Sequence, residues 1–427
     1  MKRSHPQSAE TLEKLHVESP YPEIKTAWER GLSELKPSRA QLEKGLEIHG
    51  SVIAMDHFGF LPQIFTPELG KAWKALQAAQ IGGRHYHFEL GLIRREAAFY
   101  FPPALEEFLY ALAASGLSGM IQTVAEGKSI DEDIKRMASF HGIQQKAFED
   151  LAMVGSNKEI LAVEQEEKFF FIPSVNGPPC PGHLADLRDE LQWIHPWYNL
   201  GVRLMHLSYN RRNVIADGCY ESANGGLSDL GKDLIHKLNE EGIIVDIPHT
   251  GNQSCLDACA ASKKPVMATH SGRKKFHDHP RHKSDEVLKA IAGTDGLVGV
   301  VSLPSIMGRD GNLLTLLDAV EDLVGCIGAN HVAMATDYSY LRNDPAGEFV
   351  HGHLPDIEFK PSWWGNTKPG SSPKPAKPST EHFGGSLSWT NWPLFTVGLV
   401  MKGFSDRDIE KILGANFLRV FQANQPE

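Results

Sequence analysis

Residues 228–250, SDLGKDLIHKLNEEGIIVDIPHT, join a helix pattern to a buried-strand pattern without a break. Ser228 can cap the helix, apolar side chains recur on one face, and Gly242 can end it. The apolar run that follows has no polar alternation and stops at His249. A strand of this kind is buried on both faces, so the stretch predicts one helix–strand unit of a parallel sheet covered by helices.

Eight short apolar runs recur from residue 51 onward, and helix-period segments separate most of them. The runs cover residues 51–55, 118–124, 168–175, 201–208, 242–249, 265–271, 296–303 and 331–338. Eight such units predict a (β/α)8 TIM-type barrel, an α/β fold whose reactive side chains project from the C-terminal ends of the strands. A doubly wound open sheet is the structural alternative, and it lacks the closing eighth strand.

Three parts of the chain exceed this repeat. Residues 1–50 are predicted to form an N-terminal helical extension, and the barrel takes residues 51–427. Within the barrel, residues 63–118 are expected to be a helical insertion after the first strand, and residues 341–388 a long, lid-like loop after the eighth. A surface excursion is the alternative for this loop. Four of its side chains could lie over the barrel mouth: His351, His353, Trp363 and Trp364.

Composition restricts the partners of the protein. A formal net charge of -10 argues against nucleic acid, because such a partner usually needs a basic face. No run of about 18 apolar residues is present, and the basic start is followed by no apolar segment, so we expect a cytoplasmic protein with no membrane association. The five cysteines form no CxxC pair and are expected to be reduced. A small-molecule substrate fits these features best.

Three polar side chains end apolar strands in the same way. His249 and His270 follow two successive strands, and Asp337 follows the eighth. Because the strand ends of a barrel converge on one mouth, we expect these side chains to meet. Neutral imidazole and carboxylate oxygen are ordinary zinc ligands, and a catalytic site leaves one position for water. The set therefore predicts a catalytic divalent metal ion, most simply zinc.

Several motifs resemble, in order and spacing, those of the membrane (renal) dipeptidase family, zinc hydrolases of the metal-dependent amidohydrolase barrel type. They are GVRLMHLSYN at 201–210, the stretch at 228–250, KPVMATHSGRKKFHDHPRH at 264–282, HVAMATDY at 331–338 and GFSDRDIEKILGANFLRVF at 403–421. The resemblance covers roughly residues 50–63 and 165–422. It implies a hydrolase of amide or dipeptide-like bonds and a possible homodimer.

The resemblance also implies roles for four side chains. His249 and His270 match histidines that bind one zinc ion in the family. Asp337 matches an aspartate that binds the other zinc ion or handles the proton of water. Arg281, in DHPRH, matches an arginine that pairs with the substrate carboxylate, a task to which the guanidinium fork is well suited.

Four positions depart from the family pattern. The stretch DHFGFLP at 56–62 leaves Phe58 and Phe60 where the family has a histidine and an aspartate that bind the second metal ion. Asn176 stands in place of the bridging glutamate. Tyr209 stands in place of a histidine that steadies the reacting carbonyl.

These departures predict one zinc ion rather than two. A neutral amide and two phenyl rings cannot compensate the charge of a second buried dication. Asp56 and His57 lie beside the altered places, and a local shift in register could return either of them as a metal ligand. Otherwise Asp56 has a structural role.

The leading hypothesis is a divergent, mononuclear dipeptidase-like metallohydrolase acting on a small substrate that bears a carboxylate. Asp337 would act as general base, and Tyr209 would donate a hydrogen bond to the developing oxyanion. The expected substrate contacts are Arg281, Asn176, Phe58 and Phe60. Two alternatives stay open: a single-metal decarboxylase or C–C bond-cleaving enzyme, which an aromatic pocket at Phe58 and Phe60 would favour, and an inactive ligand-binding barrel.

Overall fold

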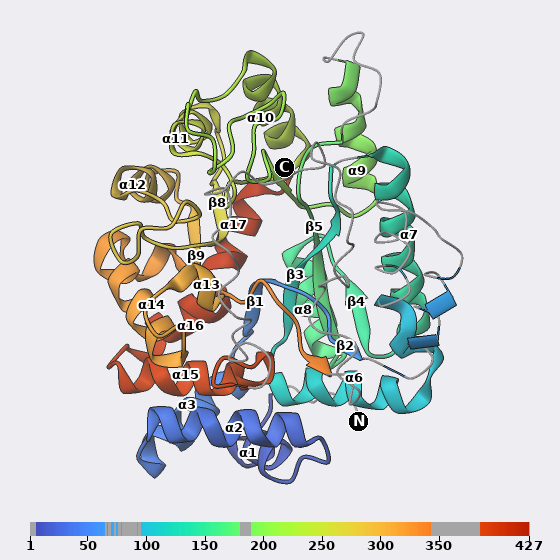
Figure 1. Cartoon of the computed structure of the whole chain (residues 1–427), viewed down its shortest axis with the longest axis vertical. Helices are drawn as coiled ribbons and strands as arrows, with labels where there is room; N and C mark the ends of the chain where they lie inside the picture. The colour runs from blue at the N-terminus through green and yellow to red at the C-terminus, as the bar shows by residue number, and fades with distance from the viewer. Residues whose placement is uncertain are drawn as a thin grey trace.

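The computed structural model describes most of the chain (Figure 1). The described residues are 6–64, 66, 70–71, 74–75, 78, 92, 95–127, 129–179, 189–342 and 385–426. The four side chains expected over the barrel mouth, from His351 to Trp364, lie outside these ranges. Most of the expected 63–118 insertion before residue 95 also lies outside them.

Eight parallel strands form a nearly closed barrel. In sheet order they are β1 (Met55–Gly59), β3 (Gly119–Ala125), β5 (Phe169–Val175), β6 (Leu204–His206), β7 (Ile244–Asp246), β8 (Met267–Ser271), β9 (Leu297–Val301) and β10 (Val332–Ala335). A further strand, β4 (Leu151–Met153), pairs with β5 beside this path. The predicted (β/α)8 fold is therefore confirmed.

Backbone hydrogen bonds between the ends of β1 and β10 close the barrel. The carbonyl oxygen of Phe58 accepts from the backbone N–H groups of Thr336 at 3.2 Å and Asp337 at 2.8 Å, and Phe60 N–H donates to the carbonyl of Tyr338 at 3.1 Å. Closure therefore holds Phe58 and Phe60 beside Asp337, at the C-terminal face where barrels carry their active sites.

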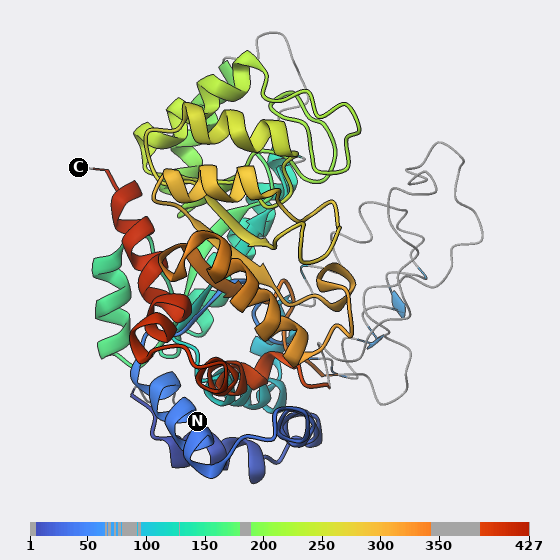
Figure 2. The same ribbon diagram turned by 90° about the vertical axis from the view of Figure 1, so that its left-hand side faces the viewer.

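Helices cover the outside of the barrel (Figures 1 and 2). The main ones are α6 (Pro102–Ser115), α7 (Ile130–Lys146), α8 (Asn157–Gln165), α9 (Ile194–Asn199), α10 (Asp229–Glu241), α11 (Asn252–Ala261), α12 (Asp285–Gly293), α14 (Leu313–Ile327), α15 (Trp392–Met401), α16 (Asp406–Glu410) and α17 (Asn416–Asn424). In α10, the Ser228 hydroxyl accepts from Gly231 N–H at 3.0 Å, and Gly242 ends the helix with φ of 81°, as the sequence predicts.

Several short elements accompany these helices and strands. They are β2 (Gln63–Ile64), which pairs with β11 (Leu341–Arg342), the helical turns η1 (Ala97–Tyr100), η2 (Asp189–Trp193), η3 (Ala329–His331) and η5 (Trp389–Asn391), the four-residue α13 (Pro304–Met307) and the π-helical η6 (Lys411–Ala415). β2 and β11 lie next to the C-terminal ends of β1 and β10 in the chain. They therefore extend the chain pairing at the barrel mouth.

Three helices precede the first strand: α1 (Ala9–Val17), α2 (Pro22–Leu35) and α3 (Arg39–Ser51). A Cβ on Gly45 of α3 would lie 2.6 Å from Val397 Cα of α15, so this helix crossing needs glycine. The strand expected at 51–55 is wrong in position. α3 continues to Ser51, and β1 begins only at Met55.

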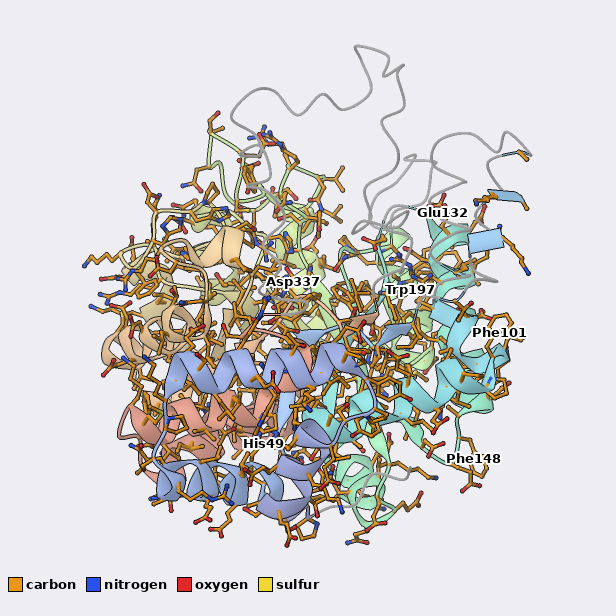
Figure 3. All side chains as sticks on the ribbon, turned by 60° about the horizontal axis from the view of Figure 1, so that its bottom comes forward. His49, Phe101, Glu132, Phe148, Trp197 and Asp337 are labelled. Atoms are coloured by element: carbon orange, nitrogen blue, oxygen red, sulfur yellow. The ribbon has the colours of Figure 1, made fainter. Side chains whose placement is uncertain are left out.

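His49 ties α3 to the rest of the fold (Figure 3). Its Nδ1 lies 2.8 Å from the Thr396 hydroxyl of α15, and its Nε2 lies 2.9 Å from the Ser115 carbonyl at the end of α6. Because His49 is fully buried, solvent cannot reach its ring nitrogens, and these two contacts satisfy both of them. This histidine is structural and stands apart from the barrel mouth.

Two further observations bear on the expectations from composition. Within the described ranges, no helix combines the length and the apolar character needed to cross a bilayer. The four described cysteines, Cys219, Cys255, Cys259 and Cys326, are free thiols, as expected. The fifth, Cys180, lies outside the described residues.

Candidate metal centre and active site

His249 and His270 meet at the C-terminal ends of β7 and β8. Both side chains are buried, and their Nε2 atoms lie 3.0 Å apart. The rings cross at 67° with their centroids 5.1 Å apart, so the two nitrogens, rather than the ring faces, approach each other. The structure thus brings together the two histidines that the sequence places at successive strand ends.

Hydrogen bonds at Nδ1 fix the tautomer of both imidazoles. The Nδ1 of His249 lies 2.7 Å from the amide oxygen of Asn210, which can only accept. The Nδ1 of His270 lies 2.8 Å from the Thr269 hydroxyl, which itself donates to the Asp246 carboxylate at 2.7 Å. Both Nδ1 atoms therefore carry the proton, and both Nε2 atoms present lone pairs.

Two lone pairs that face each other at 3.0 Å repel unless a cation lies between them. Burial, followed by the positive charge of Arg281, holds the pKa of both His249 and His270 well below the ordinary value. A shared proton is therefore disfavoured, and neutral imidazole is the form that binds a metal ion. Because a zinc–nitrogen bond is about 2.0–2.1 Å, nitrogens at this separation can reach one ion. The donor pair fits a metal ion.

Lys283 supports the turn that carries His249. Its buried ammonium group donates to the carbonyl oxygens of Pro248 at 3.1 Å and Thr250 at 2.7 Å, on either side of the histidine. The backbone around His249 is therefore held from both directions. Sequence reasoning did not single out Lys283, because it lies in a basic stretch that resembles a solvated loop.

The pair is not a complete metal site by itself. Among the described residues, no three His, Cys, Asp or Glu side chains are grouped closely enough to hold a metal ion. His206, at the end of β6, is a third histidine near the pair. Its ring centroid lies 5.5 Å from the ring centroids of His249 and His270. The third protein ligand expected from the sequence is therefore not identified.

His206 is a site residue that the sequence analysis missed. The side chain is fully buried, and its Nε2 lies 2.9 Å from a carboxylate oxygen of Asp246, although the angle does not make a hydrogen bond. Like His249 and His270, it ends an apolar run, here GVRLMH. The rule that identified the other two histidines could therefore have found it.

Asp337 follows β10 in a left-handed backbone conformation with φ of 60°. Aspartate tolerates this conformation better than most residues, and such positions cluster at functional sites. Although part of the residue is exposed, desolvation raises the pKa of its carboxyl to about 6, against the lowering effect of Arg281 and His206. In Figure 3, Asp337 lies in the middle of the view, away from the outer edge of the molecule.

Arg281 and Tyr209 flank the imidazole pair. Arg281 is buried, its Nη2 donates to the carbonyl of His270 at 3.0 Å, and its Nε has no hydrogen-bond partner within the described chain. The ring of Tyr209 stacks on His249 with centroids 4.1 Å apart, while 45% of the residue stays exposed. A buried guanidinium with an open donor and an accessible phenol thus adjoin the two imidazoles.

Phe58 occupies the side of the pair toward β1. Its ring stacks on His270 at a centroid distance of 3.8 Å and an interplanar angle of 17°. Phe60 meets Phe58 edge to face at 5.9 Å. Asn176, at the end of β5, donates through Nδ2 to Glu126 at 2.8 Å instead of presenting a charge of its own. This side of the mouth is apolar or neutral, apart from Glu126, which sequence reasoning did not identify.

Asp56 and His57 serve other contacts. The Asp56 carboxylate accepts from Thr336 N–H at 2.9 Å, from the Thr336 hydroxyl and from Trp389 Nε1 at 3.1 Å, and burial raises its pKa to about 7. His57 donates through Nδ1 to the carbonyl oxygen of Met334 at 3.0 Å and packs edge-on against Phe417. Among the described residues, no hydrogen bond or ring contact joins either to His249 or His270.

The family of the chain follows from its sequence match. Residues 104–351, more than half of the chain, match the membrane dipeptidase family, peptidase family M19, and the chain belongs to this family. The match confirms the family resemblance expected from the sequence.

Curated relatives carry dipeptidase names. An uncharacterized dipeptidase of Schizosaccharomyces pombe is 30% identical over 173 residues, which are 39% of this chain and 42% of the relative. The dipeptidase tcpJ of Claviceps purpurea is 23% identical over 244 residues, 56% of this chain and 48% of the relative. The matched part of the chain thus spans less than half the length of these two relatives.

Solved structures share the fold. An amidohydrolase from Pseudomonas aeruginosa superposes with a TM-score of 0.64 at 20% identity, covering 90% of this chain and 99% of that one. The probable dipeptidase PvdM from the same organism gives a TM-score of 0.61 at 18% identity, covering 91% and 99%. A Rhodobacter sphaeroides metallopeptidase liganded with a phosphinate mimic of the dipeptide L-Ala-D-Ala gives 0.59 at 14% identity, covering 87% and 99%.

Proposed function

We propose that the protein is a mononuclear metallohydrolase that cleaves an amide or dipeptide-like bond in a small substrate bearing a carboxylate. One observation carries the proposal: the two Nε2 lone pairs of His249 and His270 converge at 3.0 Å, with both Nδ1 atoms engaged elsewhere. Zinc is the proposed ion, because a pair of neutral imidazoles suits it. The family membership supports the same class of reaction.

Each side chain of the retained site has a proposed task. A bound zinc ion would supply a Lewis acid that makes water more acidic. Asp337 would accept the proton of that water, since a carboxyl with a pKa of about 6 is largely ionised near neutral pH and still basic enough to act. Arg281 would pair through its open Nε with the substrate carboxylate.

Tyr209 would stabilise the negative charge that develops on the carbonyl oxygen. Its stacking on His249 at 4.1 Å keeps the phenol next to the proposed metal-binding pair. The Tyr209 hydroxyl would donate a hydrogen bond to this oxygen, in place of the histidine that the family resemblance implies. Such donors contribute about 10²–10³-fold to the rate. The phenol remains protonated at neutral pH, so it can donate.

The test is hydrolysis of a dipeptide panel by protein loaded with one equivalent of zinc. The panel begins with L-Ala-D-Ala, because the Rhodobacter sphaeroides relative binds a mimic of it. We expect turnover that falls at least about 100-fold in Asp337→Asn, with bound metal unchanged. Absence of turnover on every dipeptide by the metal-loaded protein would contradict the proposal.

The same panel separates the alternatives. Release of carbon dioxide from aromatic carboxylates without dipeptide hydrolysis would favour the decarboxylase, for which the rings of Phe58 and Phe60 provide a suitable surface. Absence of both reactions would favour the ligand-binding barrel. The cytoplasmic location, the lack of nucleic-acid and membrane partners, and the homodimer stay predictions.

A further inference from the structure

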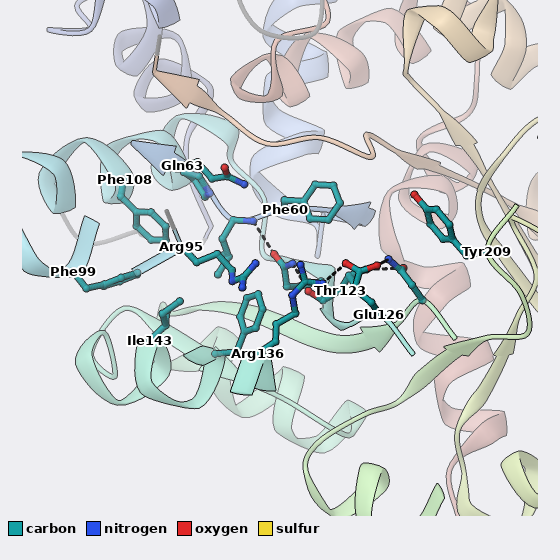
Figure 4. A pocket seen from close by; sticks show the side chains of 15 residues that line it. Phe60, Gln63, Arg95, Phe99, Phe108, Thr123, Glu126, Arg136, Ile143 and Tyr209 are labelled. Atoms are coloured by element: carbon teal, nitrogen blue, oxygen red, sulfur yellow. Dashed lines mark hydrogen bonds and ion pairs between the residues drawn. The ribbon is translucent and has the colours of Figure 1, made fainter. Parts of the chain in front are cut away.

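A cavity of about 190 Å³ opens beside the imidazole pair, between β1, β3, α6 and α7 (Figure 4). Four phenylalanine rings and one branched side chain form much of its apolar wall: Phe60, Phe99, Phe108, Phe140 and Ile143. In Figure 4, Tyr209 lies at one end of this cavity, and Phe99 and Phe108 lie at the other. Apolar walls with a few polar groups are typical of sites for small molecules.

Two routes of contact connect the cavity to the proposed metal-binding pair. Tyr209 lines the cavity and stacks on His249 with centroids 4.1 Å apart. Phe60 also lines it and meets Phe58, which stacks on His270. A molecule whose reacting bond lies at the imidazoles can therefore extend one side chain into the cavity.

The polar side chains that line the cavity have partners of their own. The Thr123 hydroxyl donates to the amide oxygen of Asn176 at 3.3 Å, and Asn176 Nδ2 donates to Glu126 at 2.8 Å. Glu126 also forms an ion pair with Arg136. Arg95 is engaged as well, in part over an aromatic ring whose centroid lies 5.5 Å away. A neutral occupant leaves all of these contacts in place.

A charged occupant would gain little from this wall. An ammonium or carboxylate group loses water when it enters an enclosed site, and this costs free energy unless a charged partner is open to it. The carboxylate of Glu126 and the guanidinium of Arg136 already compensate each other. The cavity therefore suits a group without charge.

The volume and the wall set the size and kind of the occupant. An apolar cavity of about 150 Å³ is large enough for benzene, so about 190 Å³ admits one aromatic ring with the methylene group that joins it to a backbone. Aromatic rings prefer edge-to-face or offset contacts with other rings, and the wall supplies four. A benzyl group thus fits in size, charge and contacts.

We propose that this cavity is a specificity pocket for a neutral aromatic side chain of the substrate. Phe60 stands where the resemblance to the family implies a metal ligand, so the change that removes a ligand also adds a ring to the pocket wall. The word substrate rests on the proposed function, whereas the binding of a neutral ring does not.

The test is calorimetric titration of the full chain with four ring compounds of similar size: benzyl alcohol, cyclohexylmethanol, benzylammonium and benzoate. We expect benzyl alcohol to bind at least about tenfold more tightly than benzylammonium, because the cation loses water without gaining a partner. Benzyl alcohol should also bind at least about threefold more tightly than cyclohexylmethanol, because an aliphatic ring makes no edge-to-face contacts.

Two variants locate the bound ring. Phe99→Leu removes a ring at the end of the cavity away from Tyr209 and should weaken the binding of benzyl alcohol about fivefold. Phe148→Leu is the matched control: this ring is 59% exposed and is not part of the cavity wall, so affinity should stay within about twofold. Thermal unfolding checks that each variant keeps the fold, and Phe60→Leu, at the other end, replaces Phe99→Leu if that variant does not fold.

Three results would overturn the pocket. The first is no binding of benzyl alcohol, and the second is equal affinity in Phe99→Leu and the wild type. The third is a benzylammonium or benzoate affinity that exceeds the affinity for benzyl alcohol and falls in Phe99→Leu, because the cavity would then prefer a charged occupant.

The binding test is independent of turnover. Binding of benzyl alcohol that depends on Phe99, in a protein that hydrolyses no dipeptide, would keep the pocket and contradict the proposed function. Dipeptide hydrolysis without such binding would keep the function and overturn the pocket. Where both hold, Phe99→Leu should raise KM for phenylalanine-containing dipeptides about fivefold relative to KM for L-Ala-D-Ala.

Discussion

The two sides of the barrel mouth differ in chemistry although they belong to the same barrel. The β7–β8 side keeps His249 and His270 together with the groups that orient them. The β1–β5 side has Phe58, Phe60 and Asn176 at the places where the resemblance to the family implies metal ligands. Only the β7–β8 side therefore presents facing imidazole donors with groups that fix their tautomer, and this difference is the basis of the proposed single metal site.

The supporting contacts make this point on the retained side. Asp246 holds Thr269, and the Thr269 hydroxyl holds the Nδ1 of His270 at 2.8 Å. These residues do not need to touch a metal ion, yet they set the tautomer that one requires. Phe58, on the β1–β5 side, stacks on the imidazole ring of His270. The two sides of the mouth therefore pack directly against each other.

The largest expected effect comes from removing a retained imidazole. His270→Ala takes away one of two facing Nε2 atoms and leaves Phe58 without its stacking partner. We expect kcat/KM for the best dipeptide to fall by more than about 10³-fold, with loss of bound metal. Phe58→Leu, on the altered side, should keep the metal; equal metal loss in both variants would contradict a one-sided site.

Asp337 is expected to control the acidic limb of the pH profile. Its pKa of about 6 means that the carboxyl takes up a proton as the pH falls through that value and can no longer accept one from water. We therefore expect kcat/KM to fall about tenfold per pH unit below about 6. Asp337→Asn should be slower by about 100-fold or more, and flat with pH; a limb that persists in this variant would assign it to another group.

Thr269→Val tests the supporting contacts alone. The substitution keeps the shape of the side chain but removes the hydroxyl between Asp246 and His270 Nδ1. We expect metal affinity to fall about 10–100-fold, measured by competition with a chelator. Thr336→Val, which removes the hydroxyl that contacts Asp56 on the β1 side, is the matched control and should leave metal affinity unchanged.

The smallest effect on the site is expected at His57, where the change concerns stability. Burial lowers the pKa of folded His57 to about 4, whereas the unfolded chain has an ordinary value near 6.5. Above about pH 6.5 both states are neutral; as the pH falls toward 4 the unfolded state alone gains the proton, so folding is destabilised.

His57→Phe should remove this part of the pH dependence. Urea titrations at pH 7 and pH 4.5 give the decrease in the free energy of unfolding between these two pH values. This decrease should be smaller in the variant than in the wild type, by up to about 3 kcal/mol. Only this difference between the two pH values counts, because the variant also loses the contact with the Met334 carbonyl. Reduced metal content in the variant would instead return His57 to the metal site.

Much of the fold was predictable from local patterns. Eight apolar runs correspond to the eight barrel strands, and the cap at Ser228 and the stop at Gly242 are where the sequence places them. The start of β1 was missed because Val52 and Ile53 are apolar but follow a helix that continues to Ser51. Apolar character alone does not separate a helix end from a strand.

The site was only partly predictable. His249 and His270 could be paired because both end strands, but the facing of their Nε2 atoms depends on Asn210 and Thr269. Both residues lie within the quoted motifs, yet sequence reasoning assigned no role to either of them. The cavity was not foreseen: Arg95 and Arg136 are far apart in the chain and resemble ordinary helix-surface cations. Only packing brings them to one space.

The most direct measurement is metal content per chain, by plasma mass spectrometry on protein purified without chelator. We expect about one zinc ion in the wild type and none in a His249→Ala/His270→Ala double variant. A triple variant with Phe58→His, Phe60→Asp and Asn176→Glu, which rebuilds the altered side, should take up a second ion. Two ions in the wild type, or none even after zinc is supplied, would contradict a single retained metal site.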